Sequence, residues 1–199
     1  MTEPTDARAR LRADCARCAA LCCVAPAFAA SADFAIDKPA GHACPNLRDD
    51  ARCGIHAELR ERGFPGCTVF DCFGAGQQMV QTTSAGRRDL RSPEVSMVFG
   101  VQRQLHELLW YLTEALALDA AAPLSRELAA AHQRAERLTA AGPRELAAVD
   151  PGVLRQEGGA LLMSVSELAR SGVRPRGRDR RGADLVGAGL RATELRGAD

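Results

Sequence analysis

Apolar residues recur at steps of three and four positions through the second half of the chain, which is the period of an amphipathic α-helix. The first such stretch follows Ser92 and Pro93, a pair typical of a helix start because serine caps free amides and proline fits the first turn. We expect a long helix from Pro93, with one apolar face formed by Val98, Val101, Leu105, Leu108, Leu112 and Leu116.

Two further helices are predicted by the same period. One runs from Pro123 to Ala141 and ends at Gly142-Pro143. The other begins at the capping pair Asp150-Pro151 and reaches about Arg170, although Gly158-Gly159 weakens its middle. A short helical turn is expected between them, from Glu145 to Val149. Together these stretches predict a small helical bundle.

The first half of the chain lacks this period. Phe34 and Ile36 indicate a short strand, and the sequence Asp37–Gly41 indicates a tight loop after it. Gly74 and Gly76 could suggest a phosphate-binding loop after another strand, but the third glycine, the lysine and the hydroxyl residue of such loops are missing. We therefore expect a flexible exit from the first half at this point.

Cysteine is confined to this first half. Two residues separate the first pair, a spacing that lets one tight turn aim both sulfurs at a zinc or iron ion about 2.3 Å away. Adjacent cysteines in extended backbone point to opposite faces, so the sequence predicts two sites, a dinuclear cluster, or one ligand set with spare thiols. The candidate ligands are Cys15, Cys18, Cys22, Cys23, Cys44, Cys53, Cys67 and Cys72.

Disulfide bonds and a thiol-filled core are the alternatives to metal. Disulfides persist in exported proteins, and the apolar run from Cys18 to Ala30 superficially resembles a signal peptide. Acidic residues precede the run and Pro26 interrupts it, so we reject that interpretation. No stretch approaches the ~20 apolar residues of a membrane span. We expect a cytoplasmic protein in which clustered thiols bind metal.

The cysteine segments resemble the CxxCxxCC family of putative zinc- or iron-chelating domains over about residues 12 to 76. The similarity rests on Cys15-Ala-Arg-Cys18-Ala-Ala-Leu-Cys22-Cys23, Cys44-Pro-Asn-Leu47, Arg52-Cys53-Gly-Ile-His56 and Cys67-x4-Cys72. It implies zinc or iron bound through the eight cysteines, an iron–sulfur cluster included, without naming a reaction.

Other polar residues of this part could assist a metal site. His42 and His56 are alternative nitrogen ligands, although a histidine near a cysteine is more often a supporting or surface group. Several arginines could offset the negative charge of bound thiolates. They are Arg17, Arg48, Arg52, Arg60 and Arg62.

Leucine occupies every fifth position near the C-terminus, at Leu185, Leu190 and Leu195, with a small residue two places before each. This pattern resembles the pentapeptide-repeat family, whose members wind into a right-handed β-helix. The resemblance implies that these leucines, with Ala183, Ala188, Thr193 and Ala198, face inward. Four units make one coil and stacked coils are needed for stability, so we expect an incomplete stub.

Composition adds limits on partners. The net charge is +1, and the arginine-rich residues 172–182 are best explained as a solvated linker, so nucleic acid is not an expected partner. A protein partner could bind the helices or the repeat tail. No arrangement of nucleophile, base and orienting group is recognisable, so an enzyme is not argued. An iron–sulfur redox protein and an interaction scaffold with a structural metal stay open as alternatives.

The predicted fold is mainly α, in four parts. They are a cysteine-rich, metal-stapled module at residues 1–78, a helical bundle at 92–171, a basic linker at 172–182 and a pentapeptide-repeat stub at 183–199 that forms an incomplete right-handed β-helix.

Overall fold

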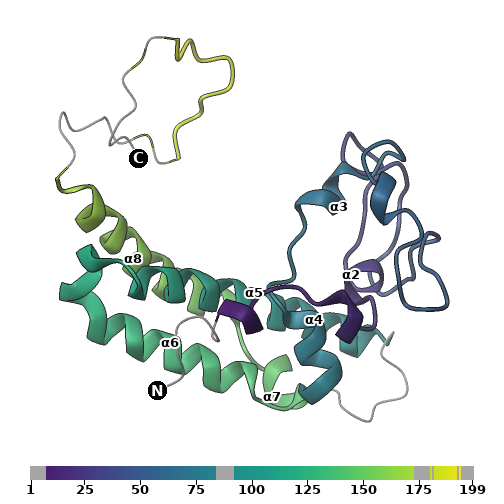
Figure 1. Cartoon of the computed structure of the whole chain (residues 1–199), viewed down its shortest axis with the longest axis horizontal. Coiled ribbons are helices and arrows are strands. Elements are labelled where there is room, and N and C mark those ends of the chain that lie inside the picture. The colour runs from purple at the N-terminus through teal and green to yellow at the C-terminus, as the bar shows by residue number, and fades with distance from the viewer. Residues whose placement is uncertain (1–7, 84–91, 173–179, 181, 192, 194–199) are drawn as a thin grey trace.

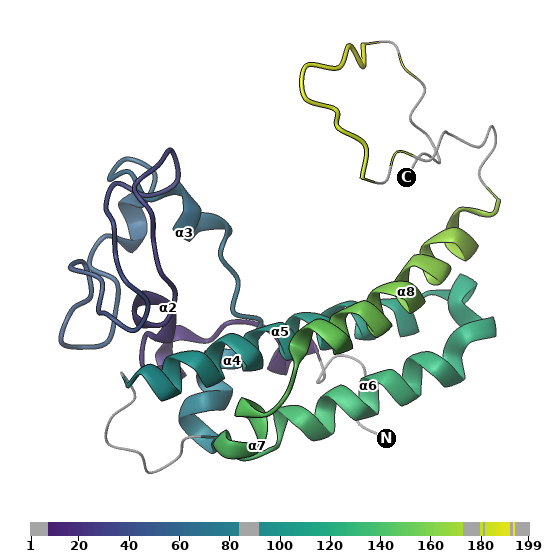
Figure 2. The same cartoon turned by 180° about the vertical axis from the view of Figure 1, so that it is seen from behind.

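Three long helices lie side by side in the computed structural model, which describes residues 8–83, 92–172, 180, 182–191 and 193 (Figure 1, Figure 2). They are α5 (Pro93–Leu116), α6 (Ser125–Thr139) and α8 (Pro151–Arg170). Helix α5 packs against both α6 and α8 and is therefore the central element. The cysteine-rich segment projects from one end of this helical layer, around α2 and α3 in Figure 1.

The shorter helical elements connect and cover the long ones. In the cysteine-rich part they are η1 (Cys15–Arg17), α2 (Leu21–Val24), η2 (His56–Glu58), α3 (Pro65–Val69) and α4 (Ala75–Gln78), which continues as the π-helical η3 (Met79–Thr83). Among the long helices they are η4 (Asp119–Leu124) and α7 (Pro143–Ala147).

Capping side chains fix the first residues of two long helices, α5 and α8, at the predicted positions. The Ser92 hydroxyl accepts a hydrogen bond from the amide of Val95 at 3.3 Å, and the Asp150 carboxylate accepts one from Gly152 at 2.8 Å. Both predicted starts, and the predicted end at Arg170, are confirmed. Each cap satisfies an amide that has no partner inside its helix.

The second predicted helix differs at both ends. Pro123 lies within η4, and α6 begins two residues later at Ser125. It ends at Thr139, two residues before the predicted end at Ala141. Proline lacks an amide hydrogen and therefore suits a short 3₁₀ segment better than the interior of α6. The apolar face of α5 also ends earlier than predicted, because Leu116 is 40% exposed whereas Leu112 is fully buried.

One hydrophobic core joins the cysteine-rich part to the long helices. Leu21 of α2 and Met79 after α4 are buried in the same cluster as Val98 and Leu112 of α5 and Leu128 of α6. Cys18 and Cys72 pack against this cluster as partly buried residues. The first thiol segment is therefore anchored on the helical core, and burial of these apolar side chains provides the main stabilising contribution.

Gly158 permits the close approach of α8 to α5. A Cβ atom at this position would lie 2.5 Å from Cδ1 of Leu108, whereas a Cβ on Gly159 would meet nothing within 4 Å. The glycine pair that weakens the predicted helix thus has one member with a packing role. Leu108 is buried and has little room to move away.

Replacing these neighbouring glycines with alanine should have opposite effects. Gly159→Ala should raise the free energy of unfolding by up to about 1 kcal/mol, since alanine favours a helix. Gly158→Ala should lower it by about 1 kcal/mol, because the overpacking cost exceeds the helix gain. Urea unfolding followed by circular dichroism measures both. Equal shifts in the same direction would show that α8 does not pack as described.

No strand occurs among the described residues; their β-type pairing is limited to isolated bridges between Phe28 and Lys38 and between Leu47 and Cys53. The predicted strand at Phe34 and Ile36 is therefore wrong. The reason is that this segment folds back on itself through a local hydrogen bond from Ser31 to the carbonyl of Phe34, at 2.9 Å, instead of pairing along a ladder.

The predicted right-handed β-helix at the C-terminus is also wrong. The described tail residues, 182–191 and 193, form turns and irregular backbone. Leu185 is 37% exposed and Val186 94% exposed, so the predicted inward position of Leu185 is not adopted. A repeat coil cannot bury its inner face without stacked neighbours, and the described residues of this stretch form no stacked coil. Leu195 and Ala198 lie outside the described residues.

A buried polar network ties the end of the cysteine-rich part to the long helices. Nδ1 of His106 donates to the carbonyl oxygen of Phe73 at 2.7 Å, and Nε2 then accepts from the side-chain amide of Gln102 at 3.1 Å. The same amide donates to the carbonyl oxygen of Thr139. Burial lowers the pKa of His106 to about 4, so the ring is neutral near pH 7. The network fixes the backbone directly after Cys72.

Candidate metal-binding site

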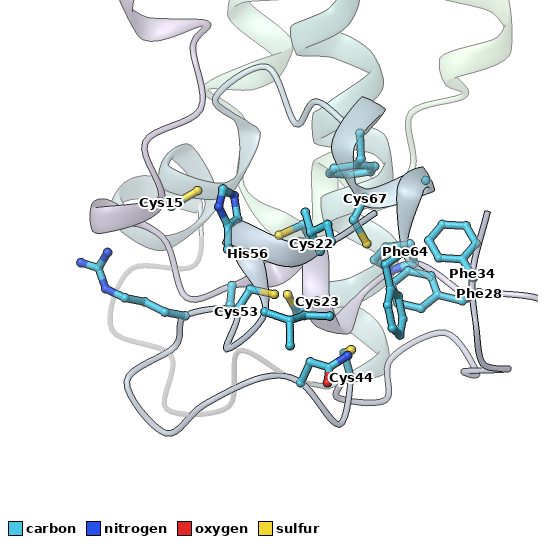
Figure 3. A pocket seen from close by; sticks show the side chains of 18 of the residues that line it. Cys15, Cys22, Cys23, Phe28, Phe34, Cys44, Cys53, His56, Phe64 and Cys67 are labelled. Atoms are coloured by element: carbon cyan, nitrogen blue, oxygen red, sulfur yellow. The ribbon is translucent and has the colours of Figure 1, made fainter. Parts of the chain in front are cut away.

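A cavity of about 640 Å³ lies within the cysteine-rich part of the chain. The structure brings together around it seven of the eight predicted cysteines, which are Cys15, Cys18, Cys22, Cys23, Cys44, Cys53 and Cys67. In Figure 3 the sulfurs of Cys22, Cys23 and Cys53 turn toward the same space. The predicted residues therefore converge, although they span 53 positions of sequence between the first and the last.

Cys72 does not line this cavity but lies beside it. The sulfurs of Cys18 and Cys72 both face Gly76, at 2.5 and 4.0 Å from the place that a Cβ atom there would take. Glycine thus leaves the room that these two sulfurs need. The segment before Cys15 is held here by Gln77, whose side chain accepts from the amide of Asp14 and donates to the carbonyl of Arg12.

The adjacent cysteines, Cys22 and Cys23, lie on the short helix α2. This backbone is helical, not extended as the prediction of opposite-facing neighbours requires. In a helix, successive side chains instead diverge by about 100° around the axis, so the two side chains leave the backbone of α2 in different directions. Their side chains remain close enough to share a hydrogen bond.

A tight loop brings Cys44 and Cys53 to the same side of the cavity. The amide of Cys44 donates to the carbonyl of Cys23 at 2.9 Å, which fixes the start of the loop against α2. The isolated bridge between Leu47 and Cys53 closes the loop, supported by a 2.7 Å bond from Gly54 to the carbonyl of Asn46. These backbone bonds place two distant thiols near Cys23.

Lys38, the single lysine of the chain, is buried beside these thiols with 4% of its surface exposed. Its Nζ donates to carbonyl oxygens in two backbone stretches, those of Val24 and Pro26 in one and of Pro39 and His42 in the other. Burial lowers the pKa of Lys38, while the nearby thiols of Cys44 and Cys23 raise it. The sequence analysis did not identify this residue as part of the site. It could have done so, because a single lysine in a chain whose other basic residues are arginines points to a specific role.

The thiols differ in how readily they ionise. A hydrogen bond from Cys23 lowers the pKa of Cys22 to about 7, and the same bond raises the pKa of Cys23. Burial raises the pKa values of Cys15, Cys18 and Cys67. Cys22 therefore becomes a metal-binding thiolate more readily than Cys15, Cys18, Cys23 or Cys67, whose raised pKa values oppose the loss of a proton.

The histidines and arginines of this region divide into two groups. His56 and Arg52 line the cavity, and Arg52 lowers the pKa of Cys15, opposing the larger effect of burial. His42 does not line it; its Nδ1 lies 3.2 Å from the carbonyl of Ala40. The other predicted arginines do not line it either, and three of them have acidic partners, namely Arg17 with Asp14, Arg48 with Asp50 and Arg62 with Glu58.

Aromatic side chains form the other end of the cavity. Phe28 and Phe34 stack with ring centroids 4.4 Å apart, and Phe64 lies beside them in Figure 3. Gly66 faces the Phe34 ring, where a Cβ atom would lie 2.6 Å from the nearest ring carbon. This apolar end keeps water away from the sulfurs on that side, which strengthens any electrostatic contact made there.

All eight cysteines lie among the described residues, and each is a free thiol. As they stand, no three histidine, cysteine or acidic side chains in the described part of the chain are grouped closely enough to hold a metal ion. The donors are thus gathered around one space without being in contact with a common point. Their chemistry suits soft or borderline metals, which thiolates prefer.

None of the described helices is both long and apolar enough to cross a lipid bilayer.

Comparison with known proteins overturns both resemblances drawn from the sequence. No family model matches the chain, so its predicted membership of the CxxCxxCC and pentapeptide-repeat families is wrong. The short motifs had suggested these families, but the rest of the sequence does not follow either pattern. No solved structure matches the chain.

One curated relative is similar over nearly the whole chain. It is the Bacillus subtilis (strain 168) protein named "Uncharacterized protein YybG", which is 43% identical over 189 residues. The match covers 91% of this chain and 67% of that protein. The chain therefore belongs to the same family as YybG.

Proposed function

We propose that this protein binds zinc or iron through the clustered cysteine thiolates of residues 15–72. The observation that carries the proposal is the convergence of seven thiols on one cavity. Cys72 lies next to this cavity, where its sulfur and that of Cys18 both face Gly76. Thiolates are the ligands that zinc, ferrous iron and iron–sulfur clusters share. The nearby Arg52 and Lys38 supply positive charge that offsets several thiolates.

Metal binding would draw the sulfurs together. The apolar contacts of the loops that carry them are confined to a few side chains, chiefly the buried Leu59 and Phe64 and the stacked Phe28 and Phe34. A small, loop-rich region gains much of its stability from a bound metal, because the ion fixes segments that are otherwise weakly connected.

Free thiols also favour a reducing compartment, and we place the protein in the cytoplasm on that ground. The metal ion is the partner that the described residues support. Iron in a cluster would make the protein a redox carrier, whereas zinc would stabilise the fold and leave the helices to contact a protein partner.

The test is the metal content of the full chain purified without oxygen. Elemental mass spectrometry should find at least one equivalent of zinc or iron per chain. Reaction with a thiol reagent should be slow before treatment with a chelator and should reach eight thiols after it. Circular dichroism should show that α5, α6 and α8 persist in the chelated protein, because the buried residues of the core that joins them are apolar side chains other than cysteine.

Two results would contradict the proposal. One is a chain without metal in which all eight thiols react at once. The other is a chain whose cysteines are oxidised to disulfides when purified from the cytoplasm with oxygen excluded.

A further inference from the structure

We propose that the eight thiols form two separate four-sulfur metal centres rather than one. The inner centre would consist of Cys15, Cys18, Cys22 and Cys72, and the outer centre of Cys23, Cys44, Cys53 and Cys67. This inference rests on the proposed metal binding and goes beyond it by assigning each ligand to a set and by setting two ions per chain.

The inner set is held against the helical core. Cys18 and Cys72 both pack on the main hydrophobic cluster, and their sulfurs face Gly76 of α4. The bonds between Gln77 and the segment before Cys15 keep η1 against α4. On the other side, the His106 bond to the carbonyl of Phe73 fixes the backbone after Cys72. Contacts with one pair of helices, α4 and α5, therefore position this set.

The outer set is held by the loops that project from the helices. The Cys44 amide bonds to the Cys23 carbonyl, and the Leu47–Cys53 bridge brings Cys53 alongside. Cys67 is on α3, where its amide donates to the carbonyl of Phe64 at 3.1 Å. None of these four cysteines belongs to the main core cluster that Cys18 and Cys72 touch.

Electrostatic neighbours divide the thiols in the same way. After burial, the thiols that most raise the pKa values of both Cys15 and Cys18 are Cys22 and Cys72. The pKa of Cys67 is raised by burial and then by Cys44, Cys53 and Cys22. The hydrogen bond with Cys22 is the main cause of the raised pKa of Cys23, and Cys53 and Cys44 add to it. The two sets meet at Cys22, which neighbours Cys23 and Cys67 of the outer set as well as Cys15 and Cys18 of the inner set.

The adjacent pair on α2 explains how the sets can be separate and yet close. Side chains at neighbouring helix positions diverge by about 100°, so Cys22 can face the inner set while Cys23 faces the Cys44–Cys53 loop. A tetrahedral ion accepts four thiolates, so two ions would use all eight cysteines. Each set also has its own cation, with Arg52 beside Cys15 and Lys38 beside Cys23 and Cys44.

The experiment compares one ligand from each set in the full chain, grown with zinc and purified without oxygen. Elemental mass spectrometry should give two zinc ions per chain for the unchanged protein. Cys72→Ser and Cys67→Ser should each retain one, and the double variant none. The control is Thr68→Ala, which lies beside Cys67 on an exposed part of α3 and should keep both ions.

A second readout assigns the remaining ion. Cobalt(II) can replace zinc, and its absorption reports the number of sulfur ligands and a tetrahedral geometry. Each single variant should keep the full four-thiolate spectrum at half the intensity, because the untouched set is complete. Cys15→Ser should behave as Cys72→Ser does, and Cys53→Ser as Cys67→Ser does, which guards against the misfolding of any one variant.

Several outcomes would overturn the inference while leaving metal binding intact. They are one ion per unchanged chain, the loss of both ions from either single variant, or a visible iron–sulfur spectrum that every single variant abolishes. Each would indicate one shared centre. An unchanged protein that binds no metal would instead contradict the proposed function itself.

Discussion

Lys38→Met is expected to open the cysteine-rich region, lowering its local stability by about 3 kcal/mol or more. The Lys38 ammonium donates to four carbonyl oxygens. Those of Val24 and Pro39 also accept from the backbone amides of Gly41 and His42, whereas those of Pro26 and His42 have no other described partner. Methionine has a similar length but no hydrogen to donate, so the carbonyls of Pro26 and His42 would lose their partner. Each unsatisfied buried group costs about 1–3 kcal/mol, and partial entry of water would offset some of the sum.

Thiol reactivity measures this effect directly. In the chelated protein, a loss of about 3 kcal/mol corresponds to thiols of Cys23 and Cys44 that react about 100-fold faster. Arg62→Met is the matched control, since Arg62 is an exposed cation of the same region whose ion pair with Glu58 contributes only a few tenths of a kcal/mol. A change below about threefold for Lys38→Met would show that the ammonium does not hold these loops.

The helices were predictable because their signals are local. Serine or aspartate followed by proline marks the start of a helix by two adjacent residues. The apolar period can be recognised within a single helix, without knowledge of its neighbours. Where the prediction failed, at Pro123, the competing 3₁₀ segment depends on how η4 packs against α8, which a local pattern does not contain.

The candidate site was predictable in its residue types and not in its arrangement. Cysteine spacing indicated metal chemistry, but the division of the thiols depends on contacts between distant segments. Examples are the bond from Cys44 to Cys23 and the contact of Cys18 and Cys72 with Gly76. No periodicity links such positions, so the sequence left several site arrangements open.

The prediction of a β-helix in the C-terminal repeat tail was wrong for the opposite reason. Its five-residue pattern is clear locally, but a β-helix is stable only when coils stack and bury the inner face. Ala188 bonds back to the carbonyl of Leu185 at 3.0 Å, so the described part has local turns without a ladder. A local pattern predicted a structure whose stability is not local.

The glycines after Cys72 are the second place where a substitution should have a large effect. The sequence suggested a flexible exit, yet Gly74 adopts a left-handed φ of +78° and packs under the N-terminal segment. A Cβ atom there would meet the backbone carbonyl oxygen of Arg10 at 2.2 Å. Backbone cannot move aside as a side-chain tip can, so the segment that leads to Cys15 would have to detach.

Gly74→Ala should therefore lower the free energy of unfolding by about 3 kcal/mol, combining about 1–2 kcal/mol for the left-handed conformation with the cost of the clash. Gly41→Ala separates the two terms. Gly41 has nearly the same φ, +77°, but its Cβ would approach nothing nearer than 3.6 Å, so only the conformational cost should appear. Urea unfolding of both variants tests this, and equal losses would mean that the N-terminal segment does not pack on Gly74. A larger loss for Gly74→Ala, accompanied by faster reaction of Cys15 and Cys18 but not of Cys53, would show that this glycine supports the inner thiols by letting the chain before them lie against α4.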